Sequence, residues 1–545
     1  MTFVRRVLGA AALVALPLAA LVLFVLLPLG AMLRRGVWPE GGFDPGAVWH
    51  VLTTTQVVRV LWFTVWTAGL ATVIALLLGV VLAFACYRLR FPGRGIVRTI
   101  AIVPFALPTV VVGIAFTRLF DPGGVLGVLG WSGTPAAIVV GLAFMNIGLV
   151  MRTVGAHWES LDVRREQAAA ALGATPWQVF RTVTLPSLVP SVLAAASVVF
   201  LFCATSFGIV LTMGGLRYSN VETEIYLLTT QELDLTSAAA LSLVQILIIV
   251  VLLVVIGRLR DRNAVVDRRI APPRRPQLHD LPLLAVAGVV IAALLVPVGT
   301  LLTASLRRDG AWSLDNYRSL AQPGATSDLP SVTSAIGNSF AIAAIATVLA
   351  LVLGGLVGYV VSRKPAGRAA RRLVAIFDGV FMLPLGVSAV TVGFGFLITL
   401  NRPPLDLRTS QVLIPIAQAM VALPLVVRTI APVWRGIDDR QRQAAASLGA
   451  GPWRVFGTVD LAAGWRPFLA AAGFALAVSL GEFGATSFLA RSDQPTLPVL
   501  IYRLMGHPGV DNFGLAMAAS TILAGTAALA MLLVERLRVS ATGVF

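Results

Sequence analysis

The sequence is poor in the residues that enzymes and metalloproteins use for their chemistry. Its 545 residues include 2 cysteines and 4 histidines, and only 12% of them are charged. Cys86 and Cys203 both fall inside apolar stretches, which gives no basis for a disulfide framework, and the histidines lack the spacing of metal ligands. We therefore expect no catalytic residues and no metal site in this chain.

Nucleotide-binding motifs are also missing. No GxxxxGK[ST] segment, the loop that cradles phosphates in many nucleotide hydrolases, occurs anywhere in the sequence. No pattern of nucleophile and base suggests a catalytic triad. The sequence thus predicts a conduit rather than an enzyme, with no cofactor bound by this chain.

Apolar residues, in contrast, are abundant. They make up 57% of the chain, and a membrane-spanning helix needs about 20 of them in succession. This predicts an all-α membrane protein with about twelve spans, six in each half. The predicted spans are 7–33, 57–87, 99–119, 134–153, 189–213, 237–257, 281–306, 337–361, 373–400, 410–430, 467–490 and 514–535.

The formal net charge of +17 could indicate nucleic-acid binding, but the placement of the charges favours another explanation. With a cytoplasmic N-terminus, about 30 of the 42 Lys and Arg residues fall in loops and tails on the cytoplasmic side. The excess of positive charge therefore indicates the orientation of the chain in the membrane. We expect a multi-pass membrane protein with both termini cytoplasmic, the lipid bilayer around it and no nucleic-acid partner.

The strongest pattern is an internal duplication. Residues 167–180 (QAAAALGATPWQVF) return as 443–456 (QAAASLGAGPWRVF), 276 residues later. The same offset relates Pro108 to Pro384 and Trp158 to Trp434. We expect a first repeat at 1–257, a basic, proline-containing cytoplasmic linker at 258–280 and a second repeat at 281–545, the two repeats being parallel in orientation.

The repeated segment reads locally as helix, tight corner, helix. Gly173 occupies a position where a helix end favours a left-handed residue, and Pro176 suits the first position of a new helix, with Thr175 as its N-cap. Trp177 and Phe180 share one face and could anchor the second helix. An amphipathic connector lying on the membrane is the alternative, but such helices use bulky apolar residues. The small Ala face instead favours insertion into a groove of a partner protein.

These residues resemble the EAA loops of the permease subunits of bacterial ABC importers. The loops span about 161–188 and 437–464, and Gln167 and Gln443 stand where the family has Glu. The resemblance implies a fused tandem permease of a bacterial plasma (inner) membrane. Its loops would dock on two ATP-hydrolysing subunits, with ATP and Mg on those partners, and its substrate would arrive on an extracytoplasmic binding protein. The coupling residues that it implies are Gln167, Ala168, Ala169, Leu172, Gly173, Pro176, Gln443, Ala444, Ala445, Leu448, Gly449 and Pro452.

Segments outside the loops resemble particular subfamilies of these permeases. The stretches 221–226 (VETEIY) and 479–484 (SLGEFG) are similar to those of thiamine-importer permeases, and fused ferric-iron permeases share some of these residues. Thiamine or a related cationic small molecule is the expected substrate, and ferric iron is the alternative.

Glu482 is the most informative residue outside the loops. It lies in an otherwise apolar span, where a carboxylate is costly unless it is paired or faces water. Because Ser206 occupies the equivalent position in the first half, we place Glu482, Ser206, Phe207 and Phe483 on a candidate pathway for a cation. The alternative is a structural acid hydrogen-bonded to a neighbouring helix, for instance to Asn146 or Gln418.

Two other classes of membrane protein compete with the importer interpretation. Twelve spans in a 6+6 repeat also describe secondary transporters, but the expected Gly-x-x-x-Asp-Arg signature is missing from 87–94 (YRLRFPGR), and only Glu482 and Asp378 are acids within spans. A purely structural or signalling module would leave the repeated loop unexplained.

Overall fold

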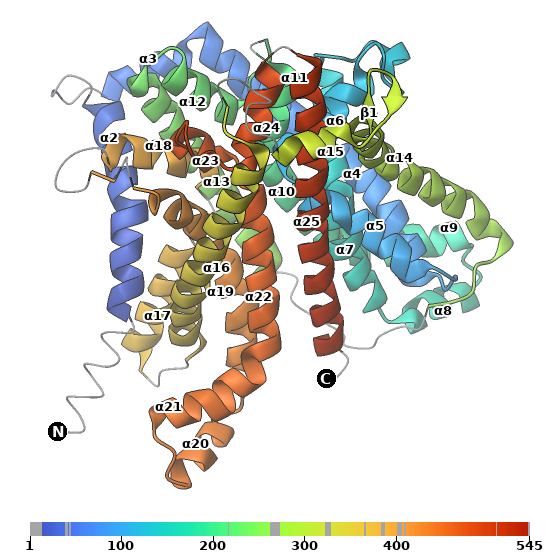
Figure 1. Cartoon of the computed structure of the whole chain (residues 1–545). Helices are drawn as coiled ribbons and strands as arrows, with labels where there is room; N and C mark the ends of the chain where they lie inside the picture. Colours follow the sequence, from blue (N-terminus) through green and yellow to red (C-terminus); the bar gives the residue numbers. More distant parts are fainter. Residues whose placement is uncertain are drawn as a thin grey trace, which may run out of the picture. The chain divides into compact units, whose positions relative to one another are not determined.

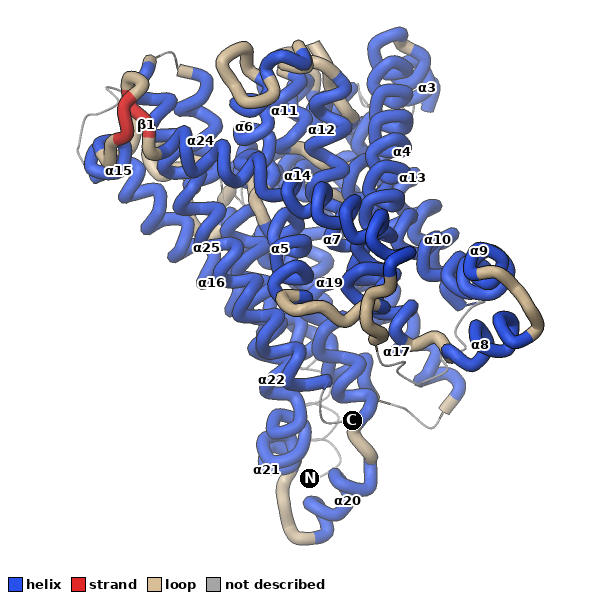
Figure 2. The backbone as a smooth tube through the Cα atoms, turned by 90° about the vertical axis from the view of Figure 1, so that its right-hand side faces the viewer, coloured by secondary structure: helices blue, strands red, loops and turns tan. Residues whose placement is uncertain are grey.

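The computed structural model describes residues 14–542 apart from short segments at 39–41, 43–44, 216, 262–272, 322–328, 364–366, 383–386, 401–405, 408–409 and 508. Residues 262–272 of the predicted linker 258–280, and Pro384, lie outside the described residues. In the described part the chain is helical, as the composition predicts, and its strands are β1 (Arg307–Arg308) and β2 (Ala311–Trp312), which pair antiparallel (Figure 2).

The described helices include ten that are long and apolar enough to cross a membrane, and a bent pair that could form one more. They are Val14–Val37, Thr55–Arg88, Pro135–Glu159, Pro176–Ala204, Leu235–Leu252, Leu278–Ser305, Val332–Ser362, Leu413–Gly436, Pro452–Gly481 and Asp511–Val534. Each overlaps one of the predicted spans. The chain is therefore a multi-pass membrane protein.

Four predicted spans are broken helices: 189–213 is divided into α10 (Leu185–Ala204) and α11 (Gly208–Gly214), and 467–490 into α22 (Ala462–Gly481) and α23 (Gly484–Leu489). The stretch 99–119 is divided into α5 (Arg94–Ala106) and α6 (Thr109–Phe120), which meet at an angle of 102°. Pro108 lies at this break as the N-cap of α6, where a residue without an N–H is tolerated. The stretch 373–400 is similarly divided into α17 (Arg368–Phe381) and α18 (Ala389–Thr399). Apolar composition alone could not reveal these breaks.

The chain packs into two units. Unit 1 contains Met1–Trp49, Ile225–Leu243 and Leu314–Phe545, and unit 2 contains His50–Glu224 and Val244–Ser313. In unit 2 the helices α4 (Thr55–Ala83), α7 (Pro135–Glu159) and α10 (Leu185–Ala204) pack against one another. In unit 1 their counterparts α16 (Val332–Ser362), α19 (Leu413–Gly436) and α22 (Ala462–Gly481) do the same (Figure 1).

The first span of each half packs away from its own half. The segment α2 (Leu27–Val37) belongs to unit 1, where it packs against α18, and the rings of Phe24 and Phe396 lie 5.9 Å apart. In unit 2, α14 (Leu281–Ser305) packs against α4, α5 and α6. The packing units therefore differ from the predicted sequence repeats at these two helices and at Ile225–Leu243, which belongs to unit 1. The repeat boundaries at 257 and 281 stay a prediction.

The duplication extends to the helix bounds. The short helices α8 (Val163–Ala171) and α12 (Val221–Thr230) return as α20 (Asp439–Ser447) and α24 (Leu497–Gly506), with both ends shifted by 276. Within α4 and α16 residues correspond at an offset of 275, which relates Gly79 to Gly354, although the bounds of these two helices do not follow it. Gly79 of α4 lies against Val150, and Gly354 of α16 lies against Val426, so that a Cβ at either glycine would approach the valine closely, within 2.7 Å. Such close contacts at small residues are typical of helices that pack in membranes.

The other described elements complete this order, and α13 and α25 among them contain the spans Leu235–Leu252 and Asp511–Val534. They are η1 (Val22–Leu26), α3 (Pro45–Thr53), η2 (Phe84–Arg88), η3 (Gly127–Leu129), α9 (Pro176–Val179), η4 (Phe180–Thr184), α11 (Gly208–Gly214), α13 (Leu235–Asp261), η5 (Leu278–Asp280), α15 (Asp315–Arg318), η6 (Ser319–Ala321), α21 (Pro452–Val455), η8 (Phe456–Leu461), α23 (Gly484–Leu489) and α25 (Val510–Thr542).

Candidate functional site: the two repeated loops

The first repeated loop has the predicted helix–corner–helix structure. Helix α8 ends at Ala171, and Gly173 follows with φ +89°, the left-handed conformation predicted for it. The N–H of Ala174 bonds to the Ala169 carbonyl at 3.2 Å, which satisfies a carbonyl at the helix end. Thr175 then caps α9, and its hydroxyl and the Gln178 side chain each accept a backbone N–H of the other residue. The corner is thus fixed by local hydrogen bonds.

The second loop repeats this structure with one difference. Gly449 has φ +84° and the N–H of Ala450 bonds to the Ala445 carbonyl at 3.1 Å. Gly451 replaces the capping threonine at the start of α21 and supplies no side-chain bond. An aspartate caps the first helix of each loop, Asp162 for α8 and Asp438 for α20. Its carboxylate accepts the backbone N–H of the second residue after it at 3.0 Å.

The tip of each loop exposes large apolar side chains. Leu172 is 90% exposed and Leu448, its counterpart, 88%. Trp177 and Trp453 are also mostly exposed, so the expectation that Trp177 anchors the second helix is wrong: it stacks on Phe180 at 5.6 Å with its outer surface free. Exposed apolar side chains gathered at one site are typical of a surface that another protein covers.

The remaining predicted coupling residues are mostly exposed. In the first loop Gln167, Ala168 and Gly173 are exposed, Ala169 is half-buried and Pro176 is exposed. The second loop matches it: Gln443, Ala444, Gly449 and Pro452 are exposed and Ala445 is half-buried. Their coupling role stays a prediction. Figure 2 shows the connection between α8 and α9 at the outer edge of that pair.

An ionic contact on the opposite side ties the first loop to its bundle. Glu166 of α8 pairs with Arg88, at the end of the α4 span, and accepts a hydrogen bond of 2.8 Å from the hydroxyl of Thr184. Thr184 is buried at the start of α10, while Arg88 and Glu166 are each less than one-fifth exposed. We call Arg88, Glu166 and Thr184 the first brace.

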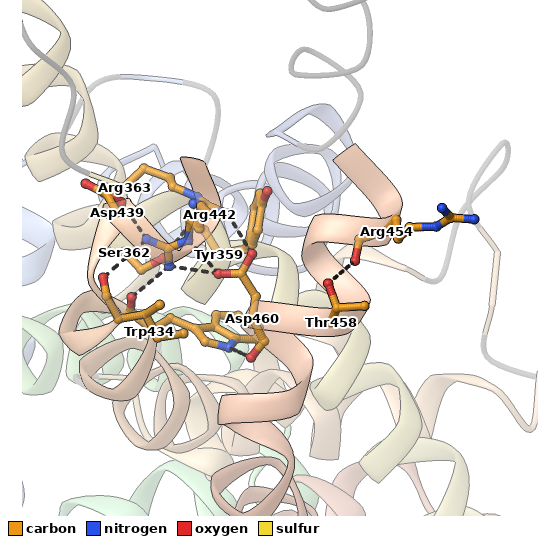
Figure 3. Close-up of polar contacts among 10 residues, drawn as sticks. Tyr359, Ser362, Arg363, Trp434, Asp439, Arg442, Arg454, Thr458 and Asp460 are labelled. Atoms are coloured by element: carbon orange, nitrogen blue, oxygen red, sulfur yellow. Dashed lines mark hydrogen bonds and ion pairs between the residues drawn. The ribbon is translucent and has the colours of Figure 1, made fainter. Parts of the chain in front are cut away.

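The second loop has a tie at the same place, made from different residues (Figure 3). Asp460, fully buried at the start of α22, contacts Arg442 of α20 at 2.7 Å and Arg363, at the end of α16, at 3.2 Å. We call Arg363, Arg442 and Asp460 the second brace. Burial lowers the pKa of Arg442, but its hydrogen bonds to Asp460 and Asp439 outweigh this effect and raise that pKa above its usual value.

Aromatic rings back each brace. In unit 1 the Trp434 indole N–H donates to the backbone carbonyl of Asp460 at 2.9 Å, and its ring lies 6.2 Å from that of Phe456. In unit 2 the equivalent rings of Trp158 and Phe180 lie 6.4 Å apart. These contacts hold the start of α22 and of α10 against the preceding long helix of the same unit.

The braces were not predicted from the sequence. The sequence patterns assign no role to Glu166, Arg88, Arg442 or Asp460. Comparison of the two copies could have pointed to the braces, because the offset of 276 makes Glu166 and Arg442 equivalent positions. The same offset sets Thr184 against Asp460, so both positions change charge together between the two copies.

The four candidate pathway residues lie at helix breaks. In unit 1 Glu482 is 6% exposed, and its carboxylate accepts the N–H of Ala485 at 2.7 Å and of Thr486 at 3.1 Å. It thus caps α23, in place of the expected partners Asn146 and Gln418. Phe483 is buried beside Tyr502, with ring centroids 5.5 Å apart.

The equivalent break in unit 2 has a neutral residue. Ser206 and Phe207 are buried between α10 and α11, and the Ser206 carbonyl accepts a hydrogen bond of 2.8 Å from the side chain of Asn220. The acid is therefore present in one copy only. The described residues contain no group of three or more His, Cys, Asp or Glu side chains that could hold a metal ion.

Comparison with known proteins gives consistent matches. Residues 75–270 match the family model of the binding-protein-dependent transport system inner membrane component. The thiamine transport system permease protein ThiP of Brucella abortus (strain 2308) is 28% identical over 496 residues, which cover 88% of this chain and 87% of that protein.

Two further matches cover about half of the chain. The sulfate transport system permease protein CysT of Escherichia coli (strain K12) is 32% identical over 255 residues, 44% of this chain and 88% of that protein. A crystal structure of a bacterial ABC transporter involved in the import of the acidic polysaccharide alginate has a chain that is 17% identical, with a TM-score of 0.42, covering 48% of this chain and 98% of that one.

Proposed function

The chain belongs to the family of inner membrane components of binding-protein-dependent transport systems, and from this premise we propose that it forms the pathway of an ATP-driven thiamine importer. Permeases of this family are transport subunits that work with an ATPase and a binding protein. Membership of this family also excludes the alternative that the chain is a secondary transporter. What remains to be proposed is the substrate, the coupling site and the number of partners.

The observation that carries the coupling role is the pair of equivalent apolar tips. Leu172 and Leu448 occupy the same position in two loops of the same structure, and both side chains are almost fully exposed. Two equal surfaces suit two equal partners. We therefore propose that each loop docks on one ATPase subunit, which binds ATP and Mg, and that this chain binds neither.

Thiamine as substrate is supported by the relatives that match both halves. The match to the thiamine permease of Brucella abortus covers 88% of this chain, and that to its Escherichia coli (strain K12) counterpart covers 90%. The buried carboxylate of Glu482, present in one half only, suits a pathway for a cation, because an acid at membrane depth needs a partner or water. We propose Glu482, Phe483, Ser206 and Phe207 as pathway residues on this basis.

The proposed orientation places both termini and both loops in the cytoplasm and the binding protein on the opposite side. The basic loops support it, since Lys and Arg concentrate on the cytoplasmic side of membrane proteins.

Reconstitution tests the proposal. The chain is placed in proteoliposomes with its ATPase and binding protein, and uptake of labelled thiamine is measured with and without ATP. ATP-dependent thiamine uptake is expected. Uptake of ferric iron in place of thiamine would overturn the substrate, and uptake without ATP or the ATPase would overturn the coupling.

A further inference from the structure

The two braces occupy equivalent positions although their charges differ. Glu166 and Arg442 lie at the same point of α8 and α20, and Thr184 and Asp460 at the same point before α10 and α22, each pair 276 residues apart. Arg88 and Arg363 are 275 residues apart, the offset that also relates Gly79 to Gly354 in the same two helices. All three corners of the brace are therefore structural counterparts.

The position of the negative charge differs between the two braces: it is on the loop helix in the first and on the following span in the second. In the first brace the anion is on the loop, Glu166, and the span contributes the neutral Thr184. In the second brace the loop carries the cation Arg442 and the span carries the anion Asp460. The arginine from the preceding long helix keeps its sign and pairs with the anion in both. The same mechanical tie is thus made with two different chemistries.

A tie at this place joins the loop to two spans of its own unit. The half-buried residues of α8 are Val163, Glu166 and Ala169, and Glu166 is the charged residue among them. The brace links the middle of α8 to the end of the α4 span and to the start of α10, which pack against each other. A displacement of the loop is then shared by both helices.

The partial burial of the braces makes this tie stiff. Asp460 is 1% exposed and Arg442 11%, so their charges are screened by water far less than those of a surface pair. Arg442 also donates to the backbone carbonyl of Trp434 at 3.1 Å, at the end of α19. The fork of one guanidinium thus connects the loop to two helices in fixed geometry.

We propose that Glu166 and Arg442 are positioning residues that transmit displacement of the two coupling loops to the spans, and that their braces are interchangeable despite the inverted charges. This inference rests on the proposed docking of an ATPase on the loops. The braces face away from the exposed tips, so they act within this chain and not on the partner.

The test uses the assembled complex of this chain with its ATPase. Hydrogen exchange is measured at 184–190 and 460–466 with and without a non-hydrolysable Mg·ATP analogue, a readout that requires no knowledge of the substrate. In the unmodified complex the nucleotide is expected to change exchange at both segments. Glu166→Arg should reduce that change at 184–190, and Arg442→Glu at 460–466, by about tenfold, a usual size for coupling between sites.

Transplanting one brace into the other repeat provides the decisive comparison. Glu166→Arg with Thr184→Asp builds the second brace in the first repeat, and Arg442→Glu with Asp460→Thr builds the first brace in the second. Both double variants should restore the nucleotide-dependent change to within about twofold of the unmodified complex. Arg371→Glu, a matched charge reversal at an exposed position of α17 outside both loops, should have no effect.

The outcomes separate the two proposals. If single variants that still copurify with the ATPase keep the full nucleotide-dependent change, or if the double variants fold but remain uncoupled, the brace inference is wrong. If a single variant is not recovered from membranes, recovery and coupling of its double variant still support the inference, and a folded, uncoupled double variant opposes it. If the unmodified chain binds no ATPase, the proposed function itself fails.

Discussion

Arg442 and Asp460 are joined by two contacts of one guanidinium: Nε lies 2.8 Å and Nη2 2.7 Å from the same carboxylate oxygen, Oδ1. The other oxygen receives Arg363 at 3.2 Å. One buried carboxylate therefore holds two arginines from two different elements of unit 1, so its loss leaves two cations without their shared anion.

Asp460→Asn should destabilise the chain strongly. Removing one partner of a buried ion pair typically costs about 3–5 kcal/mol, because the remaining charge stays buried without compensation. The measurement is the thermal midpoint of the purified chain in detergent. Asp439→Asn is the matched control, since Asp439 contacts the same Arg442 at 2.6 Å but is 64% exposed. Its loss should cost less than about 1 kcal/mol, and equal losses would contradict the assigned burial.

Gly173→Ala and Gly449→Ala should each loosen one loop. Both glycines have φ above +80°, where an alanine Cβ adds about 1–2 kcal/mol of strain. Hydrogen exchange of the Ala174 and Ala450 N–H groups checks this, since their bonds to Ala169 and Ala445 close the two corners.

Gly451→Ala is the control for this pair. Gly451 has φ −69°, and a Cβ added there would meet no other atom within 4 Å, so the cost is limited to a poorer N-cap. Exchange that rises equally in all three variants would count against the left-handed corner as the cause.

Leu172→Ser and Leu448→Ser should weaken binding of the ATPase without unfolding the chain. Neither side chain is buried within this chain, and an apolar residue at the centre of an interface contributes about 2 kcal/mol or more, roughly thirtyfold in affinity. The amount of ATPase that copurifies from membranes measures this. Val128→Ser, at another fully exposed apolar position, should leave copurification unchanged. Undiminished copurification with both leucines replaced would contradict docking at the tips.

Glu482→Gln should reduce transport more than assembly. The amide keeps one oxygen for the N–H groups of Ala485 and Thr486 but carries no charge, so the cap on α23 weakens by about 1 kcal/mol. Uptake normalised to assembled complex is the measurement. Glu482→Ala, which removes both acceptors, controls for capping. Normal uptake by a normally expressed Gln variant would remove Glu482 from the pathway.

The sequence predicted the features that depend on local pattern. Apolar length located the spans, and the Gly173 and Pro176 positions predicted the loop corner, because a left-handed residue and a helix start have strong local preferences. The offset of 276 predicted that a second loop would share this structure, which the bounds of α20 and α21 confirm.

Features that depend on tertiary packing were not predictable in the same way. The angle of 102° between α5 and α6 and the placement of α14 within unit 2 are tertiary features, which apolar length does not reveal. The role of Glu482 as a cap on α23 depends on a break in the helix that apolar composition does not reveal. The braces join residues 78 and 97 positions apart, and only comparison of the two copies could have suggested them.

Site-specific cross-linking from Leu172 and Leu448 tests whether the two loop tips dock on ATPase subunits. Both native cysteines are buried, so Leu172→Cys and Leu448→Cys introduce the exposed thiols of the described chain. Membranes carrying either variant are treated with a short thiol-to-amine cross-linker, and the products are identified by mass spectrometry. If the ATPase docks at the loop tips, both positions should cross-link to an ATPase subunit. Products that contain no ATPase subunit from either position would contradict this docking.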